Sequence, residues 1–270
     1  MTDTVFMIHG MWGGAFYWAN FRSVLEARGW RCVATTLPYH DMDPADRPDP
    51  RLGRMSLLDY AAALEHELGA FDKPPVIIGH SMGGLLAQML CARGRARAAV
   101  LLAPASPAGV MALAPSVLRS FLPVMLRWGF WRKPMRQPFG TAVYSMLHLL
   151  PPDQQRALYA QFVYESGRAA AEIGFWPLDR HRASRVEASA VTCPLLVLAG
   201  REDRITPARV VRQVARRYGA RAEYRELEQH AHWLVGEPGW EAIAEAVAQW
   251  LEAFRNTTKS AGVTLPVADS

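Results

Sequence analysis

The residues with the clearest chemical potential lie at 79–83, where the sequence reads Gly-His-Ser-Met-Gly. An apolar run at 76–78 precedes this pattern and a helix-forming run at 85–90 follows it. In a tight turn between a strand and a helix, two glycines let the backbone segments approach closely and lift the serine above the sheet. The N-terminus of the helix then stabilises negative charge that develops beside the serine. The pattern predicts that Ser81 is a nucleophile.

A serine hydroxyl is a weak nucleophile, so it needs a base and a group that orients the base. Where the serine sits on such a turn, the chain order is serine, then acid, then histidine. Asp203 directly follows a buried strand-like run at 194–200, and ligands bind at the carboxyl ends of parallel strands. We therefore predict that Asp203 is the orienting carboxylate. Glu202 is an alternative, as is Asp179, although Asp179 follows no strand-like run.

The base should follow the last strand, which we predict at 223–227. Two histidines, His230 and His232, come shortly after it. His232 precedes Trp233 and the final predicted helix, and it is the candidate general base. His230 is the alternative; otherwise it is a hydrogen-bond donor that orients the loop.

A tetrahedral oxyanion needs two backbone N–H donors. Met82, the residue after the serine, is predicted to supply one. The other should come from the glycine-rich turn at 10–14, which follows an apolar run near the start of the chain. Met11 is the predicted second donor and Trp12 the alternative. His9 is interpreted as a buried residue that supports this loop.

Strands and helices alternate along the chain in the way that predicts a parallel sheet with helices on both faces. The predicted fold is therefore α/β, with a mostly parallel sheet of about six strands. Strands are predicted at 4–9, 31–36, 76–80, 98–103, 194–199 and 223–227, and helices at 15–28, 56–70, 82–93, 207–218 and 239–254.

This alternation breaks between the fourth and fifth strands. We predict a core formed by residues 1–105 and 189–254, with a helical cap or lid inserted at 106–188. The cap has helical periodicity interrupted by prolines, which indicates several short helices. Residues 255–270 are polar and predict a disordered tail.

The cap is rich in aromatic residues and methionine. Most of these side chains should form the core of the cap itself, but some should face the serine and make a largely apolar substrate pocket. The predicted pocket residues are Trp12, Trp128, Trp131, Phe175 and Trp176.

Charge is shared unevenly between the cap and the rest of the chain. Residues 107–185 hold ten Lys/Arg and four Asp/Glu, a net charge of +6, so the remainder carries −1 of the total +5. The segment 127–133 mixes aromatic and basic side chains, as membrane-surface segments do. Transient contact with a membrane surface is one interpretation, and an ordinary solvated face is the other. No recognition motif accompanies the charge, so we do not predict nucleic-acid binding.

The order and spacing of these motifs resemble the serine hydrolases of the α/β-hydrolase superfamily. The resemblance covers about 1–105 and 190–254, and it implies an esterase- or lipase-like enzyme. The run at 9–18 also resembles the plant methylesterase and hydroxynitrile lyase branch. The lyases carry a threonine after the first histidine and a lysine after the catalytic one. Gly10 and Trp233 occupy those positions here, which argues against lyase chemistry.

Length and composition fit this interpretation. A chain of 270 residues is long enough for one large α/β domain. It has no uncharged apolar run that predicts a membrane span, and no signal segment precedes the first strand. Its three cysteines are best interpreted as buried free thiols in a reducing compartment, which predicts a cytoplasmic protein.

The expected function is that of a serine carboxylic-ester hydrolase that cleaves esters with a hydrophobic acyl or aryl part. No cofactor or metal ion is predicted, and the partner is a small hydrophobic ester. A thioesterase and a carbon–carbon bond hydrolase are alternative enzymes. A slow-turnover ligand receptor that retains the three residues is an alternative of another class.

Overall fold

Six apolar runs form one parallel sheet in the computed structural model, which describes residues 3–261. The strand order is β2-β1-β3-β4-β7-β8, and every neighbouring pair is parallel. The central strands are buried throughout, because helices cover both faces of the sheet. This arrangement confirms the predicted α/β fold. The strands are Thr4–Ile8 (β1), Arg31–Ala34 (β2), Val76–His80 (β3), Ala98–Leu102 (β4), Leu195–Gly200 (β7) and Ala222–Leu227 (β8).

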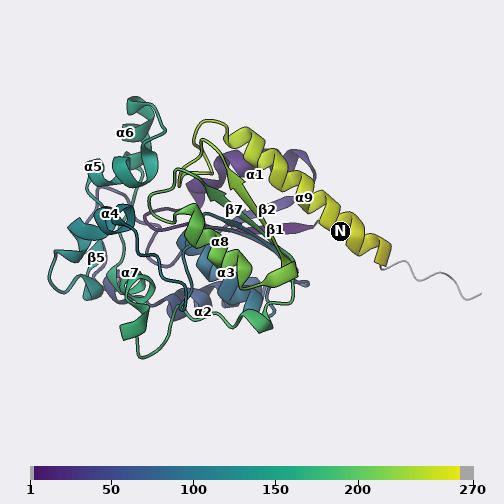
Figure 1. The fold of residues 1–270 in the computed structure, drawn as a ribbon, viewed down its shortest axis with the longest axis horizontal. Helices are drawn as coiled ribbons and strands as arrows, with labels where there is room; N and C mark the ends of the chain where they lie inside the picture. The colour runs from purple at the N-terminus through teal and green to yellow at the C-terminus, as the bar shows by residue number, and fades with distance from the viewer. Residues whose placement is uncertain (1–2, 262–270) are drawn as a thin grey trace, which may run out of the picture.

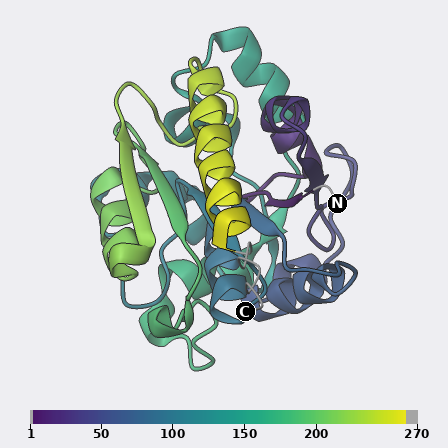
Figure 2. The same ribbon diagram turned by 90° about the vertical axis from the view of Figure 1, so that its right-hand side faces the viewer.

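The sheet is sandwiched between two layers of helices (Figure 1). On one face, α1 (Ala19–Ala27) packs against the long α9 (Trp240–Ala261). The other face carries α2 (Leu57–Leu68), α3 (Met82–Ala92) and α8 (Ala208–Arg216). In the end-on view of Figure 2, α9 comes to the front of the core. All strands point away from that end, so their carboxyl ends meet on the opposite side of the molecule.

The chain between β4 and β7 forms a separate group of short elements beside the carboxyl ends of the strands (Figure 1). Prolines lie at the first turn of two of its helices, where they have no backbone hydrogen bond to lose. We call this group, residues 106–188, the cap. Its elements are α4 (Pro115–Met125), α5 (Phe139–Ala142), α6 (Pro152–Ala160) and α7 (Gly167–Gly174), with a two-stranded antiparallel sheet of β5 (Pro134–Met135) and β6 (Glu165–Ser166).

A buried carboxylate joins the cap to the core. Glu165 of β6 is fully buried, and its side chain lies 3.0 Å from Nε2 of His40. It also accepts hydrogen bonds from the Tyr60 hydroxyl at 2.8 Å and from its neighbour's backbone N–H at 2.6 Å. Since His40 and Tyr60 belong to the core, these contacts fix one edge of the cap on it.

A second buried carboxylate makes a similar connection. Glu172 of α7 accepts hydrogen bonds from the Ser56 hydroxyl and from the backbone N–H of Leu57. Ser56 is the N-cap of α2 and forms a capping box with Asp59. The cap thus contacts the buried N-terminus of a core helix, where a carboxylate is favourable.

The last helix is longer than the sequence predicts. Residues 255–261, which we placed in the tail, continue α9 as far as Ala261. Packing explains the extension, because Phe254 stacks on Trp250 and the guanidinium of Arg255 lies over the ring of Trp30. The rest of the predicted tail, residues 262–270, lies outside the described residues. Within 3–261, no helix is long and apolar enough to cross a bilayer.

Candidate active site

The turn that carries Ser81 is strained in the way that the sequence pattern predicts. Ser81 has φ 54° and ψ −118°, a backbone conformation that side chains other than glycine rarely adopt. A Cβ atom on Gly79 would lie 2.3 Å from the Gly83 carbonyl oxygen. One on Gly83 would lie 2.1 Å from that of Ile8. Glycine is therefore required at both positions for β1, β3 and α3 to approach one another.

Three side chains from distant parts of the chain meet above this turn. Nε2 of His232 lies 3.0 Å from the Ser81 hydroxyl, and its Nδ1 lies 2.8 Å from Oδ2 of Asp203. All three side chains are almost completely buried. Because a carboxylate only accepts, Nδ1 of His232 donates to Asp203 and leaves Nε2 free to accept the serine proton. The structure thus brings together the three residues that we proposed from the sequence.

The Asp203 carboxylate is held by several donors at once. Its Oδ1 accepts from the backbone N–H groups of Ile205 at 2.7 Å and Thr206 at 2.8 Å. The hydroxyl of Thr206 lies 2.8 Å from Oδ2. Burial acts to raise the pKa of Asp203, but His232 and the bonds from Thr206 outweigh it and hold that pKa below its ordinary value. Asp203 therefore stays ionised beside His232.

The alternative residues lie elsewhere. His230 is turned away from the serine, with Nδ1 3.0 Å from Oε1 of Glu237. Asp179 accepts from the backbone N–H groups of His181 and Ala183 within the cap. The exposed Glu202 does not join the hydrogen-bonded group around Ser81 in the described residues.

The loop after β1 runs directly against the serine. A Cβ atom on Gly10 would lie 2.9 Å from Cβ of Ser81, so only glycine lets the two backbones pass at this distance. The hydroxyl of Tyr17 donates to the Met11 carbonyl at 3.0 Å and braces the turn. Met11 and Met82 both line the cavity that contains Ser81. That their backbone N–H groups are the pair of donors remains a prediction.

A cavity of about 170 Å³ extends from Ser81 into the cap. Most of its wall is apolar, and the cap supplies the larger part. Of the predicted pocket residues, Phe175 and Trp176 line it. Trp12 lines a small hollow next to Ser81 and His232. Trp128 and Trp131 line neither and are exposed, which corrects our prediction. The apolar lining includes Val110, Met111, Leu113, Val117, Leu118, Phe121, Val124, Met125, Ile173 and Ile205.

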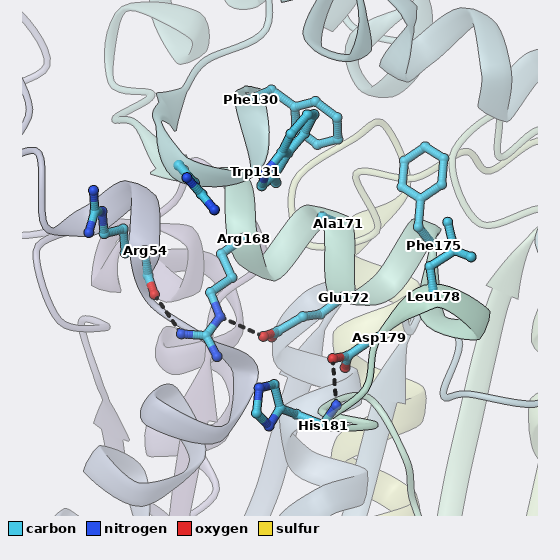
Figure 3. Close-up of a pocket in the computed structure, with 11 residues that line it drawn as sticks. Arg54, Phe130, Trp131, Arg168, Ala171, Glu172, Phe175, Leu178, Asp179 and His181 are labelled. Atoms are coloured by element: carbon cyan, nitrogen blue, oxygen red, sulfur yellow. Dashed lines mark hydrogen bonds and ion pairs between the residues drawn. The ribbon is translucent and has the colours of Figure 1, made fainter. Parts of the chain in front are cut away.

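Trp128 and Trp131 follow α4, on the outer side of the cap. Trp131 borders a much larger open hollow of about 950 Å³, which none of Ser81, Asp203 and His232 lines (Figure 3). There the Arg168 guanidinium donates to Glu172 and to the Arg54 carbonyl. Composition alone could not distinguish an aromatic residue that faces this outer hollow from one that faces the serine.

Three residues that support the site were not predicted from the sequence. His80, inside the glycine–serine motif, donates from Nε2 to the His232 carbonyl at 2.8 Å. Burial lowers its pKa to about 3, with the charge of His232 as the next cause, so His80 is neutral. Thr206 supports Asp203, and Glu237 accepts from the Ala231 backbone N–H at 2.8 Å. Thr206 and Glu237 lie within five residues of a predicted site residue, which is the only signal the sequence offered.

Solved structures of other proteins share the fold of this chain. A monoacylglycerol lipase from Paleococcus ferrophilus has 21% sequence identity and a TM-score of 0.68, covering 93% of this chain and 95% of that one. A methylesterase from Arabidopsis has 12% identity and a TM-score of 0.67, covering 93% and 99%. A pyrethroid hydrolase from Sphingobium faniae has 17% identity and a TM-score of 0.67, covering 94% and 98%.

At these identities the likeness shows the fold. No curated protein sequence matches the chain significantly. The model of the alpha/beta hydrolase family, however, matches residues 5–246, from the first strand into the last helix. The chain therefore belongs to the α/β-hydrolase family.

Proposed function

We propose that this protein is a serine carboxylic-ester hydrolase that acts on esters with a hydrophobic acyl or aryl part. The observation that carries the proposal is the hydrogen-bonded series from Ser81 through His232 to Asp203 at the end of an apolar cavity. The lipase and the methylesterase among proteins of similar fold bear names consistent with ester cleavage.

In the proposed reaction, His232 takes the proton from the Ser81 hydroxyl as its oxygen attacks the ester carbonyl. Asp203 keeps His232 in the tautomer that can accept this proton and stabilises the positive charge that results. The backbone N–H groups of Met11 and Met82 stabilise the negative oxygen of the tetrahedral intermediate. His232 then protonates the departing alcohol, which leaves an acyl group on Ser81.

Hydrolysis of this acyl-enzyme completes the cycle. A water molecule attacks the acyl carbonyl, and His232 accepts its proton in the same way. The collapse of the second tetrahedral intermediate releases the acid and returns the proton to Ser81. The strained backbone at Ser81 holds its side-chain oxygen above the sheet, as the attacking group in the first half of the reaction and as the leaving group in the second.

The first test is chemical labelling followed by turnover. A fluorophosphonate should modify Ser81 alone, and p-nitrophenyl esters should be turned over many times per protein molecule. A single burst without steady-state turnover would instead favour the slow receptor. Higher kcat/KM for an acyl-CoA or for a dienoic diketone than for any oxygen ester would favour the thioesterase or the carbon–carbon hydrolase.

A series of p-nitrophenyl esters then tests the acyl specificity. Activity should rise beyond acetyl by nearly fourfold for each methylene, about 0.8 kcal/mol, until the cavity is full. Phe121→Ala enlarges the cavity and should move the preferred acyl group to a longer chain. Trp128→Ala is the matched control, since Trp128 does not line the cavity and its loss should leave the profile unchanged. A maximum at acetyl in all three proteins would show that the cap does not select the acyl group.

A further inference from the structure

Exposed large hydrophobic side chains gather on the cap. Ten such side chains are exposed in the described part of the chain, and nine of them lie within the cap. The tenth, Leu58, is on α2 of the core and is 38% exposed. Single exposed hydrophobic residues are ordinary on a protein surface, but a group of this size marks an interaction site. The nine are Met111, Leu113, Leu118, Leu122, Leu126, Trp128, Trp131, Phe175 and Leu178.

Helix α4 presents part of this group as a stripe. Leu118, Leu122 and Leu126 are four residues apart, so they lie on one side of the helix, and they are 50%, 49% and 75% exposed. Ser120 and Val124, on the other side, are buried. A helix that faced only water would carry polar residues along its outer side.

Exposed apolar residues also lie just before and just after α4 in the chain. Leu113 precedes α4 and is 65% exposed, and Trp128 follows it and is 83% exposed. The Trp128 ring packs edge-on against Trp131, with 5.4 Å between the ring centroids. We call Leu113, Leu118, Leu122, Leu126 and Trp128 the apolar face.

The charges beside the apolar face are all positive. No aspartate or glutamate occurs between Asp72 and Asp153. Arg127, Arg132 and Lys133 are exposed, and among the described residues no carboxylate lies within ion-pair distance of any of them. Unpaired cations that flank exposed leucine and tryptophan complement a surface that is anionic at its boundary and apolar beneath.

The apolar face also adjoins the cavity of Ser81. Leu113 and Leu118 belong to both, and so contribute to the cavity lining as well as to the exposed stripe. The open hollow in Figure 3 shares Phe130 and Phe175 with this cavity. Its charged lining is mixed, with Arg54, Arg132 and Arg168 beside Glu172 and Asp179. The apolar lining of the cavity is thus continuous with an exposed apolar surface.

We propose that the apolar face docks on an anionic phospholipid surface, with Arg127, Arg132 and Lys133 against the headgroups. Docking in this orientation places the cavity of Ser81 next to the lipid, from which a hydrophobic ester can enter without crossing water. The use of the docked state for catalysis rests on the proposed function; the docking itself does not.

The test measures binding to vesicles with the full chain carrying Ser81→Ala, so that no lipid is cleaved. The protein should co-sediment with phosphatidylglycerol vesicles and much less with phosphatidylcholine vesicles, and added salt should weaken the binding. Absence of co-sedimentation with phosphatidylglycerol, or equal binding to both lipids, would overturn the proposal.

Paired variants locate the surface. Leu122→Asp with Leu126→Asp, and separately Arg127→Glu with Arg132→Glu, should each weaken vesicle binding by at least about tenfold, since one basic residue near an anionic surface contributes roughly fivefold. The matched controls are Leu58→Asp, an exposed leucine outside the cap, and Arg221→Glu, next to the amino end of β8 at the opposite edge of the sheet. Both controls should bind as the parent does.

Other outcomes separate this proposal from its alternatives. If the Leu122 and Leu126 changes dissociate a dimer and no variant binds vesicles, the apolar face joins two copies of the chain and the docking proposal is wrong. With Ser81 restored, all four variants should turn over a soluble p-nitrophenyl ester at the parental rate. Vesicle binding without that turnover would contradict the proposed function, whereas turnover without vesicle binding would contradict only the docking proposal.

Discussion

The core and the cap use buried and exposed side chains in opposite ways. In the core, parallel strands place Ser81, Asp203 and His232 in the loops after β3, β7 and β8, and β3 and β7 are fully buried. The cap has only a two-stranded sheet of its own, is joined to the core through buried carboxylates, and carries nine of the ten exposed large hydrophobic side chains of the described residues. If the proposed function is correct, the core supplies the reacting groups and the cap selects the molecules that reach them.

The largest expected effect is in the core. Ser81→Ala should lower kcat for a p-nitrophenyl ester by about 10⁴-fold or more, because the three residues act as a unit. The thermal midpoint should stay close to that of the parent protein, since the substitution removes only one hydroxyl and leaves the packing around residue 81 unchanged. Residual turnover above a hundredth of the parental rate, with the fold intact, would mean that another group is the nucleophile.

The two histidines of the last loop sharpen the assignment. His232→Ala should cost nearly as much kcat as Ser81→Ala, because base and nucleophile work in the same step. His230→Ala removes a bond to Glu237 but no contact with Ser81, so it should cost about tenfold or less. Steady-state rates of both variants with one soluble ester make the comparison. A reversed order would place the base at His230.

Changes at the junction between the cap and the core should lower the stability of the protein. Glu165→Ala leaves His40, Tyr60 and a backbone N–H without their buried acceptor and should lower the free energy of unfolding by about 3 kcal/mol. Glu187→Ala is the control, because the Arg185–Glu187 ion pair is exposed to solvent and should contribute little to stability. Urea unfolding of both variants measures the difference. Equal effects would show that the cap needs no buried connection.

The last expected effect is on the pH dependence of stability. Burial, as the main cause, raises the pKa of Glu237 to about 8, above its value of 4.5 in an unfolded chain. The folded state then binds the proton more tightly, so this group's contribution to stability is complete below pH 4.5 and is lost as pH rises towards 8. Glu237→Gln cannot ionise. Its thermal midpoint relative to the parent should therefore rise by about 6 °C between pH 5 and pH 8. A difference that is constant with pH would show that Glu237 does not titrate in this range.

Local sequence patterns were sufficient to predict those features for which backbone geometry allows few alternative residues. The strained turn at Ser81 needs glycine at two fixed positions, and the spacing alone reveals it. The alternation of strands and helices predicted the sheet because periodicity follows from burial on both faces. Asp203 was chosen over Asp179 because it follows a predicted strand, and the carboxyl ends of parallel strands meet at one edge. His232 was chosen over His230 because it precedes Trp233 and the last predicted helix.

Other features depend on contacts between distant residues. The end of α9 was placed too early because its last turns are stabilised by Trp30, far away in the sequence. The local sequence around Glu165 and His40 does not predict that their side chains are in contact. Supporting roles such as that of His80 became visible only when the loop after β8 was placed beside it.

The sequence by itself determined the fold, the order of the three site residues and the unequal distribution of charge, because each of these follows from spacing along the chain. Only the tertiary structure decided which aromatic residues of the cap face Ser81. Phe175 and Trp176 line its cavity, whereas Trp128 and Trp131 are exposed on the outer side, although all four are aromatic residues in one basic segment. The direction in which a side chain points depends on how short helices pack against one another, and composition does not encode that packing.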